Sequence, residues 1–371
     1  MAELSKPSSA ARAIIGSQQF RSTESSEKVR EMNGAEQFNA LVVRRDDHGS
    51  FSRQIETLTA ADLPSADVRI RVEWSSLNYK DALAAEAHPG VAGKLPHVPG
   101  IDAAGVIVAA DDERFEVGQQ VLVTGHELGA RQWGGWSGEI RVPGDWVIPL
   151  PADLTTREAM IIGTAGFTAA QSLLKLEQQG ITPDSGPILV TGATGGVGCL
   201  AVRLLAASGY EVVASTGKAD AESWLRDLGA AEVISREAVT GAVDGKRPLF
   251  STRWAGAVDT VGGSTLATVL ASTKLHGCVT ACGLVAGSDL PTTVYPFILR
   301  GVTLAGITSQ NCPRETRITI WQAFATRWKF DLATVLAGTA ELSELDPHIA
   351  QILAGGVRGR ILVKLSSPDV R

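Results

Sequence analysis

The stretch LVTGATGGVGCLAVRLLAASG, residues 189–209, decides the fold of this chain. Gly192, Gly195 and Gly198 stand between one apolar run and a second, longer one. Glycines at this spacing let the backbone turn sharply from a strand into a helix, and let it approach a pyrophosphate at the helix N-terminus. A glycine-rich turn used only for close strand–helix packing is the alternative. The flanking order favours a dinucleotide-binding loop.

Strand-like and helix-like runs alternate on the C-terminal side of that loop, as in YEVVAS (210–215) and GCVTACGL (277–284). Regular alternation predicts parallel βαβ units with helices on both faces of a sheet. Before the loop, short strand candidates such as DVRIRVEWSSL (67–77) and AGVIVAA (104–110) are separated by Gly, Pro and Asp turns. A chain of 371 residues is long for one core. We therefore expect an α/β protein with a β-rich domain and a doubly wound parallel-sheet domain.

The composition excludes several classes of protein. Hydrophobic residues make up 44% and charged residues 20%, an ordinary globular balance. No apolar stretch reaches the ~18 uninterrupted residues of a membrane helix, so no membrane partner is expected. The net charge of -6 argues against a broad nucleic-acid surface. Four cysteines without a C-x-x-C pair are typical of a reducing compartment, which predicts a cytoplasmic location.

The first 37 residues differ from the rest. They are rich in Ser, Ala, Arg and Glu and lack the apolar core of about 7–15 residues that a secretory signal has. Their acidic residues disfavour an organellar transit peptide, which remains the alternative. This composition predicts a disordered or loosely docked extension.

The stretch YEVVASTGK (210–218) indicates which dinucleotide is bound. Many strands at this position end in a carboxylate that bonds the 2′-hydroxyl of NAD and would repel a 2′-phosphate. Here the strand ends in Thr216, Gly217 and Lys218, and the nearby acid, Glu211, stands at its start. A hydroxyl, an open backbone amide and a cation suit a phosphate dianion. The stretch predicts a preference for NADPH, the alternative being that Lys218 is a solvated surface lysine.

From about residue 38 to 366 the chain resembles the zinc-free, quinone-oxidoreductase-like branch of the medium-chain dehydrogenase/reductases, and within it the acryloyl-CoA reductases. The segments that carry the resemblance are SSLNYKDALA (75–84), PHVPGIDAAGVI (96–107), WGGWSGEIRVPGDWVIPLP (133–151), GTAGFTAAQSL (163–173), VTGATGGVG (190–198), STGK (215–218), PFILRGVTLAGITS (296–309) and GRILVKL (359–365). LNYKDAL and PFILRG together are fairly specific to this branch, whereas the glycine motif indicates only the superfamily.

The resemblance implies a GroES-like catalytic domain built from both ends of the chain, with a Rossmann domain inserted between them. The expected boundaries are an extension at 1–37, a catalytic domain at 38–162 and 306–371, and an NADPH-binding Rossmann domain at 163–305. It also implies a homodimer.

The resemblance further implies that no metal is bound. Zinc alcohol dehydrogenases of this superfamily carry a Gly-His-Glu motif and a ligand cysteine in their N-terminal half. The matching position here reads Gly100-Ile101-Asp102, and no cysteine precedes Cys199, so a tetrahedral zinc site is not expected there. A second Gly-His-Glu, at 125–127, has no cysteine near it in sequence and is interpreted as coincidence. His88 and His97 are interpreted as surface or core residues.

Without a Lewis acid, hydride addition to a polarised double bond is the natural chemistry. For acryloyl-CoA, hydride from NADPH adds at Cβ, the thioester oxygen becomes an enolate that needs hydrogen-bond donors, and a proton returns at Cα to give propionyl-CoA. A quinone or general enone reductase on the same scaffold is the main alternative. A non-catalytic NADPH-binding protein with an RNA partner conflicts with the acidic charge, and a methyltransferase conflicts with the Thr-Gly-Lys turn.

The resemblance places the segment at 78–81 at the nicotinamide cleft. Tyr79 is predicted to touch the cofactor and to donate a proton or hydrogen bond, with Asn78 as a second catalytic donor, while Lys80 and Asp81 pair to fix the turn. A structural tyrosine is the alternative for Tyr79. The predicted cofactor-binding residues are Tyr79, Thr194, Gly195, Gly196, Val197, Gly198, Thr216, Gly217, Lys218, Leu284, Ile298 and Ser309, of which Leu284 and Ile298 are equally compatible with a core.

Two features leave questions open. Relatives often carry a basic residue after the LGA turn, where this chain has Glu232, so one contact to the adenosine phosphate is predicted to be missing. CoA also needs cationic contacts, and Arg131, Arg300 and Arg314 are available without any spacing that selects one of them.

Overall fold

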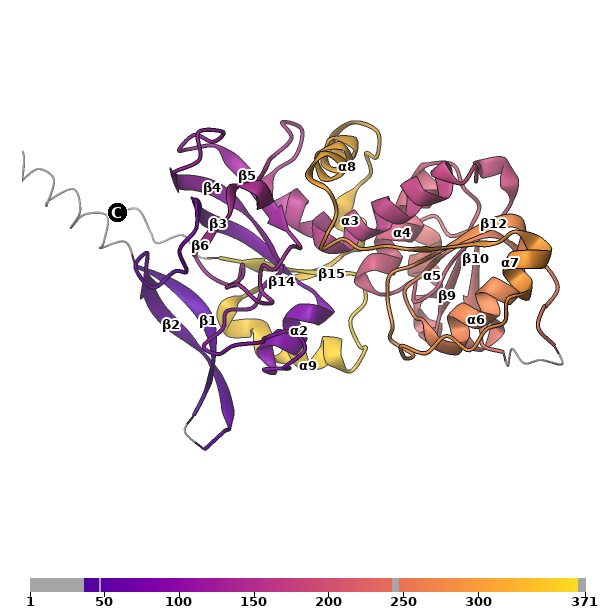
Figure 1. Cartoon of the computed structure of the whole chain (residues 1–371), viewed down its shortest axis with the longest axis horizontal. Helices are drawn as coiled ribbons and strands as arrows, with labels where there is room; N and C mark the ends of the chain where they lie inside the picture. The colour runs from indigo at the N-terminus through magenta and orange to yellow at the C-terminus, as the bar shows by residue number, and fades with distance from the viewer. Residues whose placement is uncertain (1–36, 47, 242–246, 366–371) are drawn as a thin grey trace, which may run out of the picture.

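The computed structural model describes residues 37–46, 48–241 and 247–365. The predicted disordered extension therefore lies outside the described residues, apart from Gln37, which begins a strand. Figure 1 shows two bodies side by side, one built on a mostly antiparallel sheet and the other on a parallel sheet. The predicted α/β fold is confirmed.

The first body contains a two-stranded pair, β1–β2, and a seven-stranded sheet in the order β14-β15-β3-β4-β5-β7, with β6 paired to β3. Its strands are β1 (Gln37–Arg45), β2 (Phe51–Thr59), β3 (Val68–Leu77), β4 (Asp102–Ala110), β5 (Gln120–Thr124), β6 (Glu139–Val142), β7 (Ile148–Pro149), β14 (Leu336–Glu341) and β15 (Arg360–Lys364). The last strand runs antiparallel to β3, with Ile361 opposite Leu77. Segments before and after the parallel sheet in sequence thus pair in one sheet.

The second body is a six-stranded parallel sheet in the order β10-β9-β8-β11-β12-β13. Its strands are β8 (Ile188–Val190), β9 (Val212–Thr216), β10 (Glu232–Ser235), β11 (Trp254–Asp259), β12 (Thr273–Ala281) and β13 (Thr303–Gly306). Renumbered from β8 as the first strand, this is the 3-2-1-4-5-6 order of a dinucleotide-binding sheet, in which ligands bind at the carboxyl ends of the strands where the order reverses.

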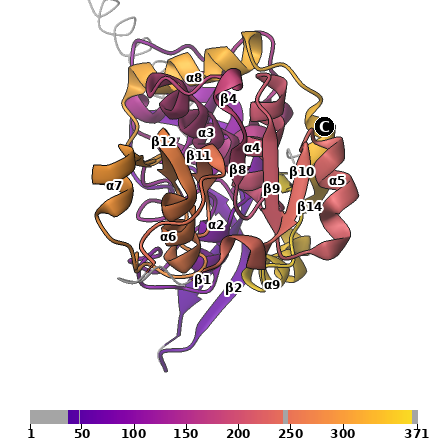
Figure 2. The same ribbon diagram turned by 90° about the vertical axis from the view of Figure 1, so that its right-hand side faces the viewer.

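Helices cover both faces of this sheet, as Figure 2 shows. The α-helices within the described residues are α2 (Tyr79–Ala85), α3 (Thr156–Gln178), α4 (Gly196–Ala207), α5 (Glu222–Asp227), α6 (Gly263–Ser272), α7 (Tyr295–Arg300), α8 (Arg314–Thr326) and α9 (Leu345–Leu353). Alternate residues of β8 point to opposite faces: Ile188 packs in the core with α3 and α4, and Leu189 in the core with α6. The unbroken apolar strands of the sequence therefore follow from a sheet buried on both sides.

Helix α3 connects the two bodies. It begins with a capping box in which Thr155 and Glu158 bond each other's backbone amides, the usual sequence signature of a helix start. Gly163 interrupts it with φ 50° and ψ -162°. By length and composition α3 is apolar enough to cross a membrane, but 78% of its apolar window is buried inside the protein. It is a core helix.

Candidate active site

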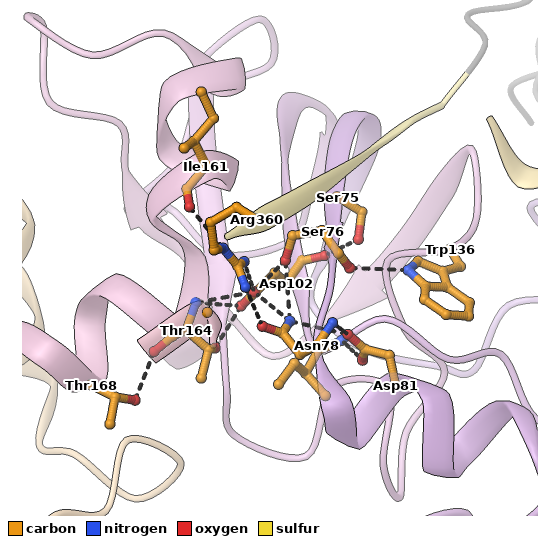
Figure 3. Close-up of polar contacts among 12 residues, drawn as sticks. Ser75, Ser76, Asn78, Asp81, Asp102, Trp136, Ile161, Thr164, Thr168 and Arg360 are labelled. Carbon is orange, nitrogen blue, oxygen red and sulfur yellow. Dashed lines mark hydrogen bonds and ion pairs between the residues drawn. The ribbon is translucent and has the colours of Figure 1, made fainter. Parts of the chain in front are cut away.

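Asp102, the first residue of β4, is the centre of a buried polar network between the two bodies (Figure 3). Its carboxylate accepts hydrogen bonds from Ser76 Oγ at 2.7 Å, from Thr164 N at 3.0 Å and from Thr164 Oγ1 at 2.5 Å. The guanidinium of Arg360 lies 4.0 Å away, with both side chains almost fully buried. A buried carboxylate is tolerated only when it is paired and hydrogen-bonded in this way. Four segments that are distant in sequence thus meet at one charge pair.

Asn78 is held inside this network. Its Oδ1 accepts a hydrogen bond from Arg360 Nη1 at 3.0 Å. Its Nδ2 lies 2.9 Å from Asp102 Oδ2, 3.0 Å from Asp81 Oδ2 and 3.1 Å from Ser76 Oγ. An amide nitrogen carries two hydrogens, so these acceptors already use both of them. This arrangement does not support the predicted role of Asn78 as a second catalytic donor, and it favours a positioning role.

Asp81 and Lys80 do not form the turn-fixing pair that the sequence suggested. Asp81 is fully buried and accepts hydrogen bonds from the backbone amides of Ile101 at 2.7 Å and Asn78 at 2.8 Å. Burial, together with the Asp102 carboxylate, raises the pKa of Asp81 to about 7. The Nζ of Lys80 instead donates to Gln310 Oε1 at 3.0 Å, in the segment that follows β13.

Three of the predicted nicotinamide-side residues lie at or just after the ends of helices and strands. Tyr79 begins α2 with 53% of its surface exposed, unusual for a tyrosine beside a buried network. Leu284, 67% exposed, follows β12, and Ser309 follows β13, so both leave the carboxyl edge of the parallel sheet. The structure does not bring Ile298 to the same place: it lies on α7, which Figure 1 places far from α2.

The glycine loop at 192–198 has the geometry that a pyrophosphate requires. Gly192 has φ 58°, and a Cβ added to Gly198 would lie 2.3 Å from the Gly192 carbonyl oxygen. The first helical hydrogen bond of α4 runs from Cys199 N to Gly195 O, so the amides of Gly196, Val197 and Gly198 precede the helical ladder and are free to meet an anion. The residues present fit the phosphates of a dinucleotide.

Thr194 ties this loop to the C-terminal segment of the first body. Its carbonyl accepts a hydrogen bond from Gly359 N at 3.0 Å, and its hydroxyl lies 3.5 Å from Thr216 Oγ1. A Cβ on Gly196 would lie 3.0 Å from Arg360 Nη1. The buried Asp102 network therefore directly adjoins the cofactor loop.

Basic groups collect at the carboxyl end of β9, where the sequence predicted a phosphate site. Lys218 Nζ donates to the Val357 carbonyl at 2.6 Å, and burial and the neighbouring Arg358 lower the pKa of Lys218. The guanidinium of Arg236 lies against Gly217, so closely that a Cβ there would meet Nη2 at 2.0 Å. A guanidinium therefore lies beside Gly217, although Glu232 had suggested that a basic group is missing there. The sequence pattern did not indicate that Arg236 and Arg358 lie here.

The second Gly-His-Glu motif has a structural explanation. His126 stacks on Trp146 with ring centroids 5.2 Å apart. Burial, with the charges of Arg317 and Arg314, lowers the pKa of His126 to about 4. Within the described residues, no group of three or more His, Cys, Asp or Glu side chains is placed to hold a metal ion.

The three arginines considered for binding CoA differ in how many hydrogen bonds their guanidinium groups already make. Arg300 donates to the backbone carbonyls of Ala271, Thr273 and Phe250, and Arg314 donates to that of Val147. Arg131 keeps 78% of its side chain exposed beside Glu127 at 4.0 Å. Of the three, Arg131 has its guanidinium most available to a ligand.

Comparison with known proteins agrees with this architecture. Residues 64–152 match the family described as "Alcohol dehydrogenase GroES-like domain", and residues 196–326 match "Zinc-binding dehydrogenase". An acrylyl-CoA reductase, AcuI of Ruegeria pomeroyi, is 45% identical over 89% of this chain and 100% of its own length. A putative quinone oxidoreductase, YhfP of Bacillus subtilis, is 46% identical over 88% of this chain and 99% of its own length.

Two solved structures of similar fold are oxidoreductases or related dinucleotide-binding proteins as well. The yhdH oxidoreductase from Salmonella enterica, in complex with NADP, is 43% identical with a TM-score of 0.85, covering 88% of this chain and 100% of that one. The Bacillus subtilis protein yhfP with NAD bound is 45% identical with a TM-score of 0.85, covering 89% of this chain and 100% of that one. The chain therefore belongs to the medium-chain dehydrogenase/reductases, in the quinone-oxidoreductase-like branch that includes the acrylyl-CoA reductases.

Proposed function

We propose that this protein reduces acryloyl-CoA to propionyl-CoA with NADPH as the hydride donor. It is an NADP-dependent oxidoreductase acting on a C=C bond. The observation that carries the substrate proposal is 45% identity to an acrylyl-CoA reductase along that protein's whole length. The substrate-side segment LNYKD lies at the junction of the two bodies, next to the cofactor loop.

The choice of NADPH over NADH rests on charge. The group formed by Thr216, Lys218, Arg236 and Arg358 stands where an NAD-binding strand commonly carries an acid. Solved relatives contain NADP or NADPH, but also NAD in one case. Because a 2′-phosphate is a dianion, paired guanidinium and ammonium groups bind it more strongly than a hydroxyl. We assign Thr194 to Gly198 to the pyrophosphate and Thr216 to Lys218, with Arg236, to the 2′-phosphate.

Different residues of the chain have different roles in the proposed reaction. When bound, the cofactor supplies a hydride to the substrate Cβ. The exposed Tyr79 contacts the nicotinamide and returns a proton to Cα, consistent with its position at the first turn of α2. Asn78 positions that turn, because Arg360, Asp102 and Asp81 occupy its amide group. Where zinc enzymes place a ligand histidine, this chain has Ile101, and we propose that no metal takes part.

We propose that Arg131 contacts a CoA phosphate. It lies in the loop that reaches Gln310, since His126 N donates to the Gln310 carbonyl at 3.3 Å. Its ion pair with Glu127 is exposed and long at 4.0 Å, so exchanging it for a phosphate costs little.

The test is the loss of NADPH absorbance with acryloyl-CoA, crotonyl-CoA and a benzoquinone, repeated with NADH and with a chelator. We expect fast turnover of acryloyl-CoA with NADPH that the chelator does not change. Turnover of the quinone alone would replace the proposal by a quinone reductase, the function printed for YhfP. Tight NADPH binding without turnover of any of the three would favour a non-catalytic role.

We also propose a cellular location and an oligomeric state for the protein. All four cysteines are free thiols, which supports a reducing, cytoplasmic location.

A homodimer is supported by the edge strand β13 and the exposed apolar side chains next to it, Leu275, Val294, Tyr295, Ile298 and Leu299. Edge strands of this kind pair readily with another chain.

A further inference from the structure

The reduction of an enoyl thioester requires a hydrogen-bond donor for the thioester oxygen. As hydride adds to Cβ, the electrons of the C=C bond move toward the carbonyl and the oxygen becomes negative. Asn78 cannot serve, because its two amide hydrogens face Asp102, Asp81 and Ser76. Arg360 donates to the Ile161 carbonyl and to Asn78, and although its Nη2 has no hydrogen-bond partner, its side chain is only 2% exposed beside Asp102 and does not open toward a substrate. The donor must come from elsewhere.

Lys80 has the required position. It follows Tyr79 on α2, is partly buried, and reaches Gln310, 230 residues away in sequence. Gln310 follows Ser309 in the loop that leaves the carboxyl end of β13. In an open parallel sheet, ligands bind outside the carboxyl ends of the strands. The ammonium of Lys80 is therefore held on the carboxyl side of the parallel sheet, beyond its last strand β13, and this is the side on which the nicotinamide and substrate are expected.

Lys80 also has unused donors. An ammonium carries three hydrogens, and the bond of 3.0 Å to Gln310 Oε1 uses one of them. That bond fixes the long, flexible stem, so the other two N–H groups are oriented before the substrate arrives. Preorganised donors of this kind are the ones that stabilise developing charge most effectively.

Resting on the proposed function, we infer that Lys80 is a catalytic residue that donates a hydrogen bond to the thioester oxygen as the enolate forms. Hydride and its electron pair form the new C–H bond at Cβ, and the π pair becomes the enolate. Lys80 keeps its proton. The enolate then reforms the carbonyl as Cα takes a proton from the Tyr79 hydroxyl, which is restored from water. Lys80 and Tyr79 thus act on different atoms.

The first test compares Lys80→Met with Lys94→Met. Methionine keeps the apolar stem without the charge, and Lys94 is an exposed lysine outside the site. We expect kcat for acryloyl-CoA to fall about 10²–10³-fold in Lys80→Met, as when one oxyanion donor is removed, with the Kd of NADPH within about threefold of the parent. Lys94→Met should match the parent. A fall in kcat of less than about threefold in Lys80→Met would overturn the inference.

A second readout separates catalysis from a structural role. Acetoacetyl-CoA forms an enolate with its own near-ultraviolet absorbance, and it can be titrated on the enzyme with NADP⁺ present. We expect the parent to ionise this ligand at a pH about two units lower than Lys80→Met does, equivalent to a hundredfold difference in oxyanion stabilisation. Identical titrations would reduce Lys80 to a structural residue. If Lys80→Met does not fold, Gln310→Leu, which removes the anchor, must give a smaller change in the same direction.

The two proposals fail in distinguishable ways. If the parent does not turn over acryloyl-CoA but reduces a benzoquinone, the substrate proposal fails while Lys80 remains testable, since hydride addition to a quinone also leaves charge on oxygen. A loss of quinone reduction in Lys80→Met would then uphold the role of Lys80. Unchanged quinone reduction would reject it.

Discussion

At the scale of single residues, the cofactor preference depends on a few cations at the end of β9. Burial and repulsion by the Arg358 charge lower the pKa of Lys218, whose partner is a backbone carbonyl, and Arg358 itself is ion-paired with Asp220. A 2′-phosphate relieves that repulsion. We predict that Lys218→Glu raises the KM for NADPH tenfold or more, each tenfold being about 1.4 kcal/mol. Steady-state kinetics with NADH give the control: an equal rise in the KM for NADH would mean that the loop was damaged rather than the phosphate site.

Arg236 shows why part of this site could not be predicted. Ser235 pairs with Thr216 in the parallel register of β10 and β9, so the next residue, Arg236, comes to lie beside Gly217. The local pattern STGK predicted the first members of the group. The last depends on a strand register that no single stretch of sequence reveals, although pairing the two strands by their carboxyl ends would have suggested it.

Asp81 makes the stability of the protein depend on pH. Its carboxyl has a pKa of about 7 in the folded state, because it is buried near Asp102, and of about 4 in an unfolded chain. Between these values the folded state holds a proton that the unfolded state has lost, so stability falls as pH rises through the interval. We expect Asp81→Asn to remove this part of the decline. The thermal midpoint measured from about pH 5 to about pH 8 should fall by several degrees less in the variant than in the parent.

The slope of the thermal midpoint against pH is the readout in that experiment. Asparagine keeps one side-chain oxygen, so Asp81→Asn loses the acceptor for one of the two backbone amides and is less stable than the parent at every pH. Arg360, also buried nearby, stays charged in both proteins. Parallel curves for parent and variant would show that Asp81 is ionised in the folded protein throughout, and that the buried network holds two carboxylates.

At the scale of elements, α3 shows the limit of helical periodicity. The apolar spacing of residues 157–179 predicts a helix, and a helix forms, but the pattern does not reveal its kink at Gly163. The kink follows from tertiary contacts: a Cβ on Gly163 would lie 2.6 Å from Asp102 Oδ2 and 2.9 Å from Arg360 Nη2. The charge pair at the junction therefore requires a glycine there.

We predict that Gly163→Ala lowers the thermal midpoint by roughly 5–15 °C, because backbone strain and overpacking each cost about 1–3 kcal/mol. Gly180→Ala is the matched control. Gly180 also has a positive φ, 77°, but nothing lies within 4 Å of its added Cβ, so it tests the backbone alone and should cost only about 1 kcal/mol. An equal fall in the thermal midpoint of the two variants would mean that the Asp102–Arg360 network accommodates the extra methyl group without cost.

At the scale of the whole molecule, the topology explains why the site lies where it does. The chain leaves the first sheet through α3, builds the parallel sheet, and returns to pair β15 with β3. Arg360 at the start of β15 therefore stands between the Asp102 of one body and the Gly196 of the other. The sequence indicated both sheets through their strand patterns. It did not indicate that residues 357–360 lie against the cofactor loop, because that contact depends on how the two bodies close.

The oligomeric state also depends on the molecule as a whole. Strand β13 ends the parallel sheet, and Ile298 and Leu299 beside it are 68% and 57% exposed. Such an apolar edge is expected to pair with a second copy. We predict that Leu299→Asp converts a dimer into monomers in sedimentation velocity at micromolar concentration, because the charge would be buried without a partner. Val117→Asp, at an equally apolar position that is 70% exposed and far from β13 in sequence, should stay dimeric. A Leu299→Asp dimer would place the interface elsewhere, and a monomeric parent would refute the homodimer.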